Sequence, residues 1–326
     1  MKTLKTFYLL TLSTLLSLAA CSKDEGSDTP QPLTIEQTEY TLDAIDNRST
    51  TLSFTASAAW TLSVTGEDSD WLTVTPASGT AGEQTVELSA TRNYRTSART
   101  AYADLACGEQ SVRLTVTQAA ASDDTDFTTL FDPDFAKELQ KQGIIADAEN
   151  ITPEDMEKIA TMTELDVSGT YENPGTLTSL QGIEYFESLT QLSCYYNQLT
   201  SLDISANTAL TELYCYGNQL TSLDVSANMA LTWLSCSYNS LETLDISKNT
   251  ALTWLDCSSN SLTTLDVSAN TALTWLSCEN NPGDRESKFP ITAWFDNDTK
   301  PDNLEIYQGQ WTYDGKTITI DFRKAE

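Results

Sequence analysis

The stretch LTWLSCSYNSLETLDISKNTA, residues 231–251, decides the fold of this chain, because the same frame returns on both sides of it. Residues 210–230 read LTELYCYGNQLTSLDVSANMA, and residues 252–272 read LTWLDCSSNSLTTLDVSANTA. Five cysteines mark the frame at intervals of 21 residues: Cys194, Cys215, Cys236, Cys257 and Cys278. A fixed period near 20 residues is typical of a solenoid of stacked repeats, so the sequence predicts a solenoid here.

Each repeat fits the pattern L-x-x-L-x-C-x-x-N-x-L, which is the leucine-rich-repeat pattern with cysteine in place of the third apolar residue. Side chains in register on parallel strands point the same way, so neighbouring cysteines are not expected to form disulfides. A column of thiols also does not offer the tetrahedral ligand set that zinc prefers. Because a thiol is small and buries like a hydrophobic group, we expect a buried column of cysteines.

The second half of each repeat, for example LTSLDVSAN, also fits a strand pattern and offers a competing register. In that register Asp203, Asp224, Asp245 and Asp266 would form a column on the sheet, where like charges on neighbouring strands repel. Aspartate in a turn can instead accept hydrogen bonds from backbone N–H groups. We therefore place the cysteine half on the concave sheet and the aspartate half on the convex side.

This register brings aromatic residues together on the concave face. Its outward positions hold Trp233, Trp254, Trp275, Tyr195, Tyr196, Tyr214, Tyr216 and Tyr238. One interpretation is that these rings only stabilise the sheet, as cross-strand aromatic pairs do. The other is a contact site, because exposed aromatic patches usually mark one. We favour the second interpretation and predict these eight residues as a partner-binding surface.

Segments without the repeat period cover both ends of the solenoid. Residues 132–143 predict a short helix capped by Asp132, and residues 152–160 predict a second helix with a capping box. From residue 282 onward the chain alternates apolar and polar residues again, which predicts a cap of strands with a turn at Asp314 and Gly315. Over residues 127–326 the chain resembles the cysteine-ladder subgroup of internalin-type surface proteins. That resemblance implies the fold and leaves the ligand open.

Residues 33–119 alternate apolar and polar side chains in about seven short runs, which predicts an immunoglobulin-like sandwich of antiparallel strands. The segment resembles a BACON module through W-T-x-S at Trp60, DWLTVTPASG at residues 70–79 and the closing VTQ at residues 116–118. BACON modules are common in secreted bacterial glycan-handling proteins, so the resemblance implies a carbohydrate-binding or a spacer role. Trp60 and Trp71 lie in strand-like alternation, and we expect both in the core.

The first 20 residues, MKTLKTFYLLTLSTLLSLAA, have the lysines, apolar run and small residues of a secretory signal peptide. The junction LAAC resembles the lipobox of bacterial lipoproteins, which implies that Cys21 is lipidated. The acidic stretch SKDEGSDTPQP behind Cys21 is similar to the signal that exports lipoproteins of Bacteroidota-type bacteria to the outer face of the outer membrane. We therefore expect a lipid anchor in the outer membrane and a protein that faces the cell exterior.

Composition excludes several classes of function. The formal net charge is −29 and the chain contains 18 basic residues, so a nucleic-acid partner is not expected. Histidine is absent, which removes the commonest general base and the commonest metal ligand. The repeats offer no unique pair of acid and base in a pocket. We therefore predict no enzyme, no catalytic residue, no metal site and no cofactor.

The predicted fold class is mainly β, with an immunoglobulin-like β-sandwich followed by a leucine-rich-repeat solenoid that has a helical N-terminal cap and a β C-terminal cap. The predicted segments are a signal peptide (1–20), a lipidated tether (21–32), a BACON-like sandwich (33–119), a linker (120–126), an N-terminal cap with a first degenerate repeat (127–188), the 21-residue repeats (189–281) and the C-terminal cap (282–326). The predicted function is a cell-surface lipoprotein that binds an extracellular protein or glycoprotein in adhesion or host interaction. The alternative is a glycan-capture protein of a polysaccharide-uptake system.

Overall fold

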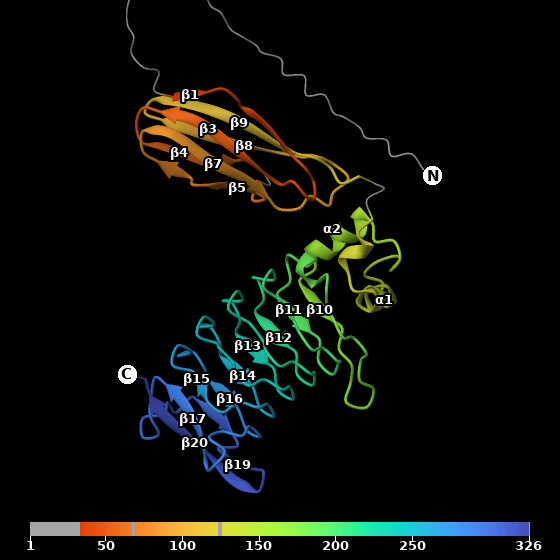
Figure 1. Cartoon of the computed structure of the whole chain (residues 1–326), viewed down its shortest axis with the longest axis vertical. Coiled ribbons are helices and arrows are strands. Elements are labelled where there is room, and N and C mark those ends of the chain that lie inside the picture. The colour runs from red at the N-terminus through yellow and green to blue at the C-terminus, as the bar shows by residue number, and fades with distance from the viewer. Residues whose placement is uncertain (1–32, 67–68, 123–125, 326) are drawn as a thin grey trace, which may run out of the picture.

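The computed structural model describes residues 33–66, 69–122 and 126–325, which form a β-sandwich and a curved solenoid (Figure 1). The predicted signal peptide, the tether and the lipidation site Cys21 lie outside the described residues. Within the described residues, none of the helices has the length and apolar character needed to cross a bilayer.

Nine strands in two sheets form the sandwich. One sheet, in the order β1-β3-β7-β5, consists of β1 (Leu33–Ile35), β3 (Ser49–Ala56), β7 (Gly82–Ala90) and β5 (Leu72–Thr75). The other sheet, in the order β2-β9-β8-β4-β6, consists of β2 (Glu39–Leu42), β9 (Gln110–Gln118), β8 (Arg99–Cys107), β4 (Trp60–Thr65) and β6 (Ser78–Gly79). The predicted sandwich is confirmed.

The sandwich differs from the prediction in strand number and in one strand direction. The first alternating run, expected as one strand, divides into β1 and β2, which belong to different sheets. The two-residue strand β6 adds the ninth strand, and β2 pairs with β9 in parallel rather than antiparallel. Trp60 and Trp71 are buried in the core between the sheets, as predicted, so neither indole offers a platform for sugars.

Two helices begin the second unit and cover the first end of the solenoid. Helix α1 (Pro133–Lys141) has Asp132 as its N-cap, whose side chain accepts hydrogen bonds from two backbone N–H groups. Helix α2 (Pro153–Thr161) has Thr152 and Asp155 as a reciprocal capping box, as predicted. Short 3-10 turns, η1 (Thr128–Leu130) and η2 (Ile183–Tyr185), flank the two helices along the chain.

Seven parallel strands form the concave sheet of the solenoid. They are β10 (Glu164–Asp166), β11 (Gln191–Ser193), β12 (Glu212–Tyr214), β13 (Trp233–Ser235), β14 (Trp254–Asp256), β16 (Trp275–Ser277) and β18 (Glu305–Tyr307). From β11 to β16, paired residues are 21 positions apart, for example Leu213 and Leu234, so the repeat period sets the register. The five cysteines that follow β11 to β14 and β16 are fully buried. The predicted cysteine register is confirmed.

Asparagines tie each repeat to the one before it. The Nδ2 group of Asn260 donates to the carbonyl oxygens of Cys236 and Cys257 at 3.0 and 3.1 Å. Its Oδ1 atom accepts a hydrogen bond of 3.0 Å from the backbone N–H of Leu241. This one side chain therefore satisfies polar backbone groups of two repeats in an otherwise apolar interior.

The convex side of the solenoid carries the aspartates in turns. Asp224 Oδ1 accepts from the backbone N–H of Ser226 at 2.9 Å, and the aspartates of the other repeats do the same. The last one, Asp266, departs from the expected turn because it belongs to the short strand β15 (Leu265–Asp266).

This strand begins a second sheet, β15-β17-β20-β19, with β17 (Lys288–Ala293), β20 (Lys316–Lys324) and β19 (Gln310–Tyr313). That sheet and β18 form the predicted C-terminal cap.

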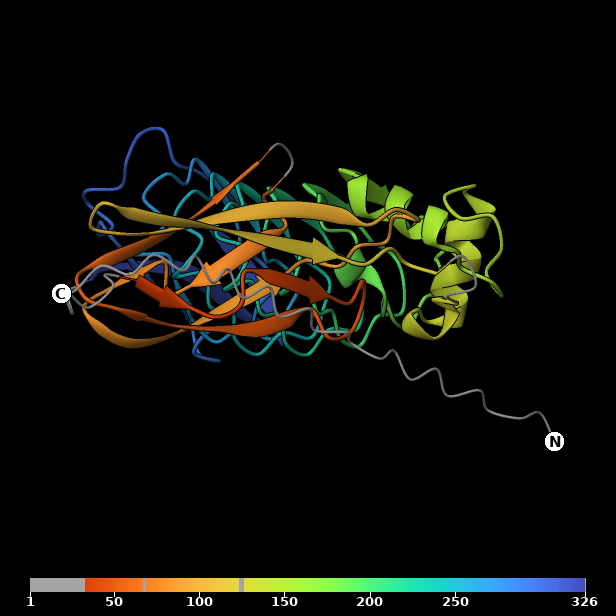
Figure 2. The same ribbon diagram turned by 90° about the horizontal axis from the view of Figure 1, so that it is seen from above.

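The sandwich is docked on the helical cap. Ala44, Tyr94 and Ala121 are buried in the same apolar core as the two helices. The ring of Tyr94 packs edge to face against Phe127 and Tyr185, with centroids 6.0 and 6.4 Å apart. Figures 1 and 2 show the helices at one end of the sandwich. The segment 120–126, expected as a separating linker, therefore contains a residue, Ala121, that packs between the two units.

Candidate functional site

The three tryptophans of the repeats form a stack on the concave face. Trp233, Trp254 and Trp275 begin three neighbouring strands and pair in register. The centroids of the first two rings are 4.1 Å apart with 9° between the planes, and those of the second two are 4.2 Å apart with 1°. Neighbouring strands lie about 4.8 Å apart, so identical side chains in register stack face to face. The ring faces cover each other, and each indole is partly exposed.

A tyrosine lies beyond each end of this stack. Tyr214 is tilted against Trp233, and Tyr307 is tilted against Trp275, each with 6.2 Å between ring centroids. We call these five rings the aromatic column. Sequence reasoning missed Tyr307, which is 50% exposed, because β18 lies in the cap and outside the 21-residue period. The alternation of apolar and polar residues in LEIYQGQW, residues 304–311, was the sequence signal for this strand.

A second group, the tyrosine cluster, lies at the side of the concave sheet and consists of Tyr171, Tyr195, Tyr196 and Tyr216. Tyr195 and Tyr216 stack with centroids 4.6 Å apart and 7° between the planes. Tyr196 packs edge to face on both and also on Tyr171. A side chain at Gly217 would collide with the ring of Tyr196, so that glycine makes room for the cluster. Tyr171 is 82% exposed and was missed because it precedes the regular repeats.

Tyr238 lies apart from both groups. It occupies the left-handed backbone region, with φ of 51°, in the turn that follows the buried Cys236. Tyr196 occupies the equivalent position two repeats earlier and takes the same conformation, also with φ of 51°. Tyr238 is mostly exposed and has no ring contact within the described residues. The structure therefore brings seven of the eight predicted residues into two groups and leaves Tyr238 alone.

Carboxylates surround the aromatic residues, and the seven strands of the concave sheet contain no lysine or arginine. Tyr214 donates a hydrogen bond of 2.8 Å to Glu212, and burial together with this carboxylate raises the pKa of Tyr214 to about 12. Ser277 donates to Glu279, whose carboxyl group is buried, and this burial raises its pKa. The face therefore combines large apolar rings with negative charge.

The thiols of the cysteine column lie buried behind this face and are poor nucleophiles. Burial raises the pKa of all five thiols of the cysteine column, that of Cys194 to about 12, and a thiol that stays protonated is a poor nucleophile. Among the described residues, no three Cys, Asp or Glu side chains are grouped so that they could hold a metal ion. The arrangement is suited to contact rather than to chemistry.

Comparisons with known proteins identify both units. Residues 32–121 match the viral BACON domain family, and residues 187–228 match a family of leucine-rich repeats in two copies. These matches confirm the resemblances to a BACON module and to leucine-rich repeats. Both are binding or repeat domains, and neither is a catalytic family. No curated protein matches the chain.

Several solved structures are similar to parts of the chain. The functional domain of InlJ from Listeria monocytogenes, which includes a cysteine ladder, is 37% identical, with a TM-score of 0.43 over 52% of this chain and 38% of that one. A leucine-rich-repeat protein of Leptospira interrogans is 30% identical, with a TM-score of 0.36 over 40% of this chain and 35% of that one. The internalin InlF of Listeria monocytogenes is 18% identical, with a TM-score of 0.36 over 62% and 73%. The chain thus spans less than half of the first two proteins.

Proposed function

We propose that the chain is a cell-surface protein that binds an extracellular protein or glycoprotein through the concave face of its solenoid. The observation that carries this proposal is the aromatic column, in which three indoles stay partly exposed on one curved surface. Tryptophan and tyrosine dominate the hot spots of protein interfaces because they offer large rigid surfaces with little entropy to lose. Leucine-rich repeats and BACON domains fit such an interaction role.

The charge of the concave face indicates the kind of partner. Glu212, Asp256 and Glu305 belong to its strands, and no basic residue of these strands offsets them. A partner surface that carries lysine or arginine beside an apolar centre would complement this face, and its association would weaken as salt concentration rises. An acidic partner would be repelled.

Glycan capture, the alternative function, has less support from the geometry of the rings. A sugar stacks on the open face of an aromatic ring, and the middle indole, Trp254, has both of its faces covered by neighbouring indoles. Open ring surface is greater at Tyr171 and Tyr307, which lie outside the tryptophan stack. A glycan site would therefore involve the tyrosines rather than the tryptophans.

The proposal includes the anchor expected from the sequence, with Cys21 lipidated and the sandwich as a spacer between membrane and solenoid. The docking of Tyr94 against the cap supports a rigid spacer, because it fixes the sandwich on the solenoid. The Cys21→Ala variant tests the anchor. It should be unlipidated and soluble, and persistent partition into the detergent phase would contradict the anchor.

The binding experiment uses the soluble protein from Asp24 onward, probed against a set of extracellular-matrix proteins and a glycan array. Replacing Trp233, Trp254 and Trp275 by alanine should weaken binding to any protein hit by about 2 kcal/mol or more. Tyr102→Ala, which removes an exposed ring from the sandwich, is the matched control and should bind normally. Glycan hits without protein hits, or unchanged binding by the triple variant, would contradict the proposal.

A further inference from the structure

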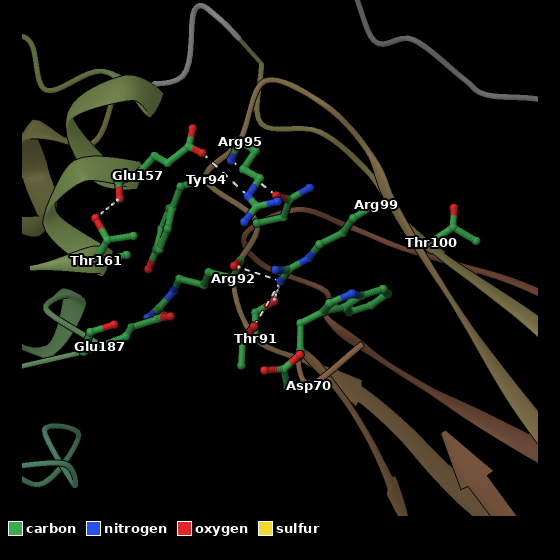
Figure 3. A pocket seen from close by; sticks show the side chains of 14 residues that line it. Asp70, Thr91, Arg92, Tyr94, Arg95, Arg99, Thr100, Glu157, Thr161 and Glu187 are labelled. Atoms are coloured by element: carbon green, nitrogen blue, oxygen red, sulfur yellow. Dashed lines mark hydrogen bonds and ion pairs between the residues drawn. The ribbon is translucent and has the colours of Figure 1, made fainter. Parts of the chain in front are cut away.

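A cleft of about 580 Å³ lies at the junction between the sandwich and the helical cap (Figure 3). One wall is the sandwich loop 91–95 together with Trp71 and Arg99. The other wall comes from helix α2 and from Glu187 and Ser188 behind η2. The cleft is large enough for a small molecule, and its lining is mostly polar.

Arginine is concentrated at this cleft in a chain that is otherwise acidic. The sequence has seven arginines, at positions 48, 92, 95, 99, 113, 285 and 323, and three of them line the cleft. Two of these three are already engaged. Arg95 forms an ion pair of 3.6 Å with Glu157, and Arg99 donates to Gln118 and Thr91 while its guanidinium lies 4.7 Å from the ring centre of Trp71.

Arg92 differs, because its guanidinium forms no ion pair within the described residues. This guanidinium lies 4.7 Å from the ring centre of Tyr185. The guanidinium of Arg92 and the hydroxyl of Tyr94 interact with each other. Beyond this contact, neither the buried Nε atom of Arg92 nor the buried Tyr94 hydroxyl has a hydrogen-bond partner. Buried polar groups are normally satisfied, so these two call for an additional partner or a local rearrangement.

Glu187 provides an unpaired charge of opposite sign on the other wall. Its carboxylate has no hydrogen bond and no ion pair among the described residues. The positive charges that act on it most strongly are those of Arg92 and Arg99. Glu187 is exposed as a residue, but partial burial of its carboxyl group raises its pKa, and the arginines oppose that change. Arg92 and Glu187 thus face one cleft from different units without being within ion-pair distance of each other.

We propose that the cleft binds a small zwitterion, an α-amino acid, whose carboxylate pairs with Arg92 and whose ammonium group pairs with Glu187. A simple anion in the cleft would be attracted by Arg92 but repelled by Glu187 and Asp70. A simple cation would be attracted by Glu187 but repelled by Arg92 and Arg99. A molecule with both charges satisfies both walls at once. Because the two charges belong to different units, a bound zwitterion also bridges the sandwich and the solenoid.

The test is calorimetric titration of the protein with two zwitterions, L-serine and L-phenylalanine, and with two single charges, acetate and ethylammonium. The zwitterions should bind at least about tenfold more tightly than either single charge, since each charge-assisted contact contributes at least one order of magnitude. The comparison of serine with phenylalanine shows whether the aromatic rings that line the cleft, Trp71 and Tyr94, take part in binding. Equal binding of acetate, or no binding of either zwitterion at millimolar concentration, would overturn the proposal.

Variants then assign the charges. Arg92→Gln and Glu187→Gln should each lower zwitterion affinity at least about tenfold, while the exposed controls Arg113→Gln and Glu149→Gln should bind as the wild type does. Thermal unfolding of every variant identifies any that misfold, and Arg92→Lys, which keeps the charge, should restore part of the affinity. The proposal would be overturned if Arg92→Gln bound the zwitterion as tightly as the wild type does. It would also be overturned if Arg92 and Glu187 formed an ion pair with each other that excluded the ligand. The triple tryptophan variant should bind the zwitterion normally, which separates this site from the concave face.

Discussion

The indole of Trp254 lies parallel to the indole of Trp275, with 4.2 Å between the ring centroids and 1° between the planes. Trp254 makes a similar contact with Trp233 on its other face, so it is the middle ring of the stack. An aromatic pair contributes about 0.5–1.5 kcal/mol beyond the burial of area. Trp275 has one stacked neighbour, Trp254, and one tilted neighbour, Tyr307, so Trp254→Ala should lower the free energy of unfolding by up to about 1 kcal/mol more than Trp275→Ala does. Urea denaturation of both variants measures the difference, and equal losses would show that a second stacked ring contributes no more than a tilted one.

The cysteine column predicts a distinct response to hydroxyl and methyl side chains. Cys236→Ser buries a hydroxyl without an assured partner and should cost about 1–3 kcal/mol. Cys236→Ala loses a small apolar contact and should cost less. Both are compared by chemical denaturation. The native protein should also react slowly with a thiol reagent at all five column positions, and rapid modification there would contradict their burial.

Alkaline pH should destabilise the solenoid through the same thiols. Their folded pKa values are raised by burial, so the unfolded chain releases these protons first, near pH 8.5. The thiols' contribution to stability is fully present below that pH and is lost as pH rises, by up to about 1.4 kcal/mol per pH unit for each thiol. Between pH 7 and 10, the free energy of unfolding should fall less steeply with pH in Cys236→Ala than in the wild type. Identical slopes would mean that the Cys236 thiol ionises equally in both states.

Asparagines form two ladders in the solenoid, one after the cysteines, which contains Asn260, and a convex one after the aspartates, which contains Asn249. The two ladders should differ in their contribution to stability. Asn260→Ala deprives the buried N–H of Leu241 of its acceptor, whereas Cys236 and Cys257 keep other donors to their carbonyl oxygens. In the convex ladder, Asn249 only donates, and its Oδ1 atom is buried without a partner. Asn249→Ala therefore leaves no N–H group unsatisfied.

We expect Asn260→Ala to be less stable than Asn249→Ala by about 1–3 kcal/mol, which is the cost of one buried unsatisfied donor. Thermal and urea unfolding of the two variants give the comparison. An equal loss in both would indicate that a water molecule takes over as the acceptor for Leu241.

Much of the solenoid could be predicted because one number, the 21-residue period, specifies which residues are neighbours. Once Cys215 is placed inward, Leu213, Asn218 and Trp233 follow, since every repeat copies the last. The helix caps at Asp132 and Thr152 were equally predictable, because capping is a local property of a few consecutive residues.

The parts that could not be predicted depend on contacts between segments without a shared period. Tyr94 meets Phe127 and Tyr185 across the junction, and no spacing in the sequence relates these three residues. The unpaired charges of Arg92 and Glu187 are invisible for the same reason, because each lies in an ordinary polar stretch. Tyr307 joins the aromatic column only because the cap adds a strand to the sheet.

The in-register repeat also makes the length of the concave surface adjustable in whole steps. Removing residues 231–251 would join Ala230 to Leu252, place Cys257 beside Cys215 and bring Asn260 next to Asn218, so that every column closes again one step shorter. A deletion one residue longer or shorter would turn inward leucines outward along the rest of the solenoid. Complete 21-residue units can therefore be removed or added with every column kept in register, which gives the concave surface a shorter or longer reach.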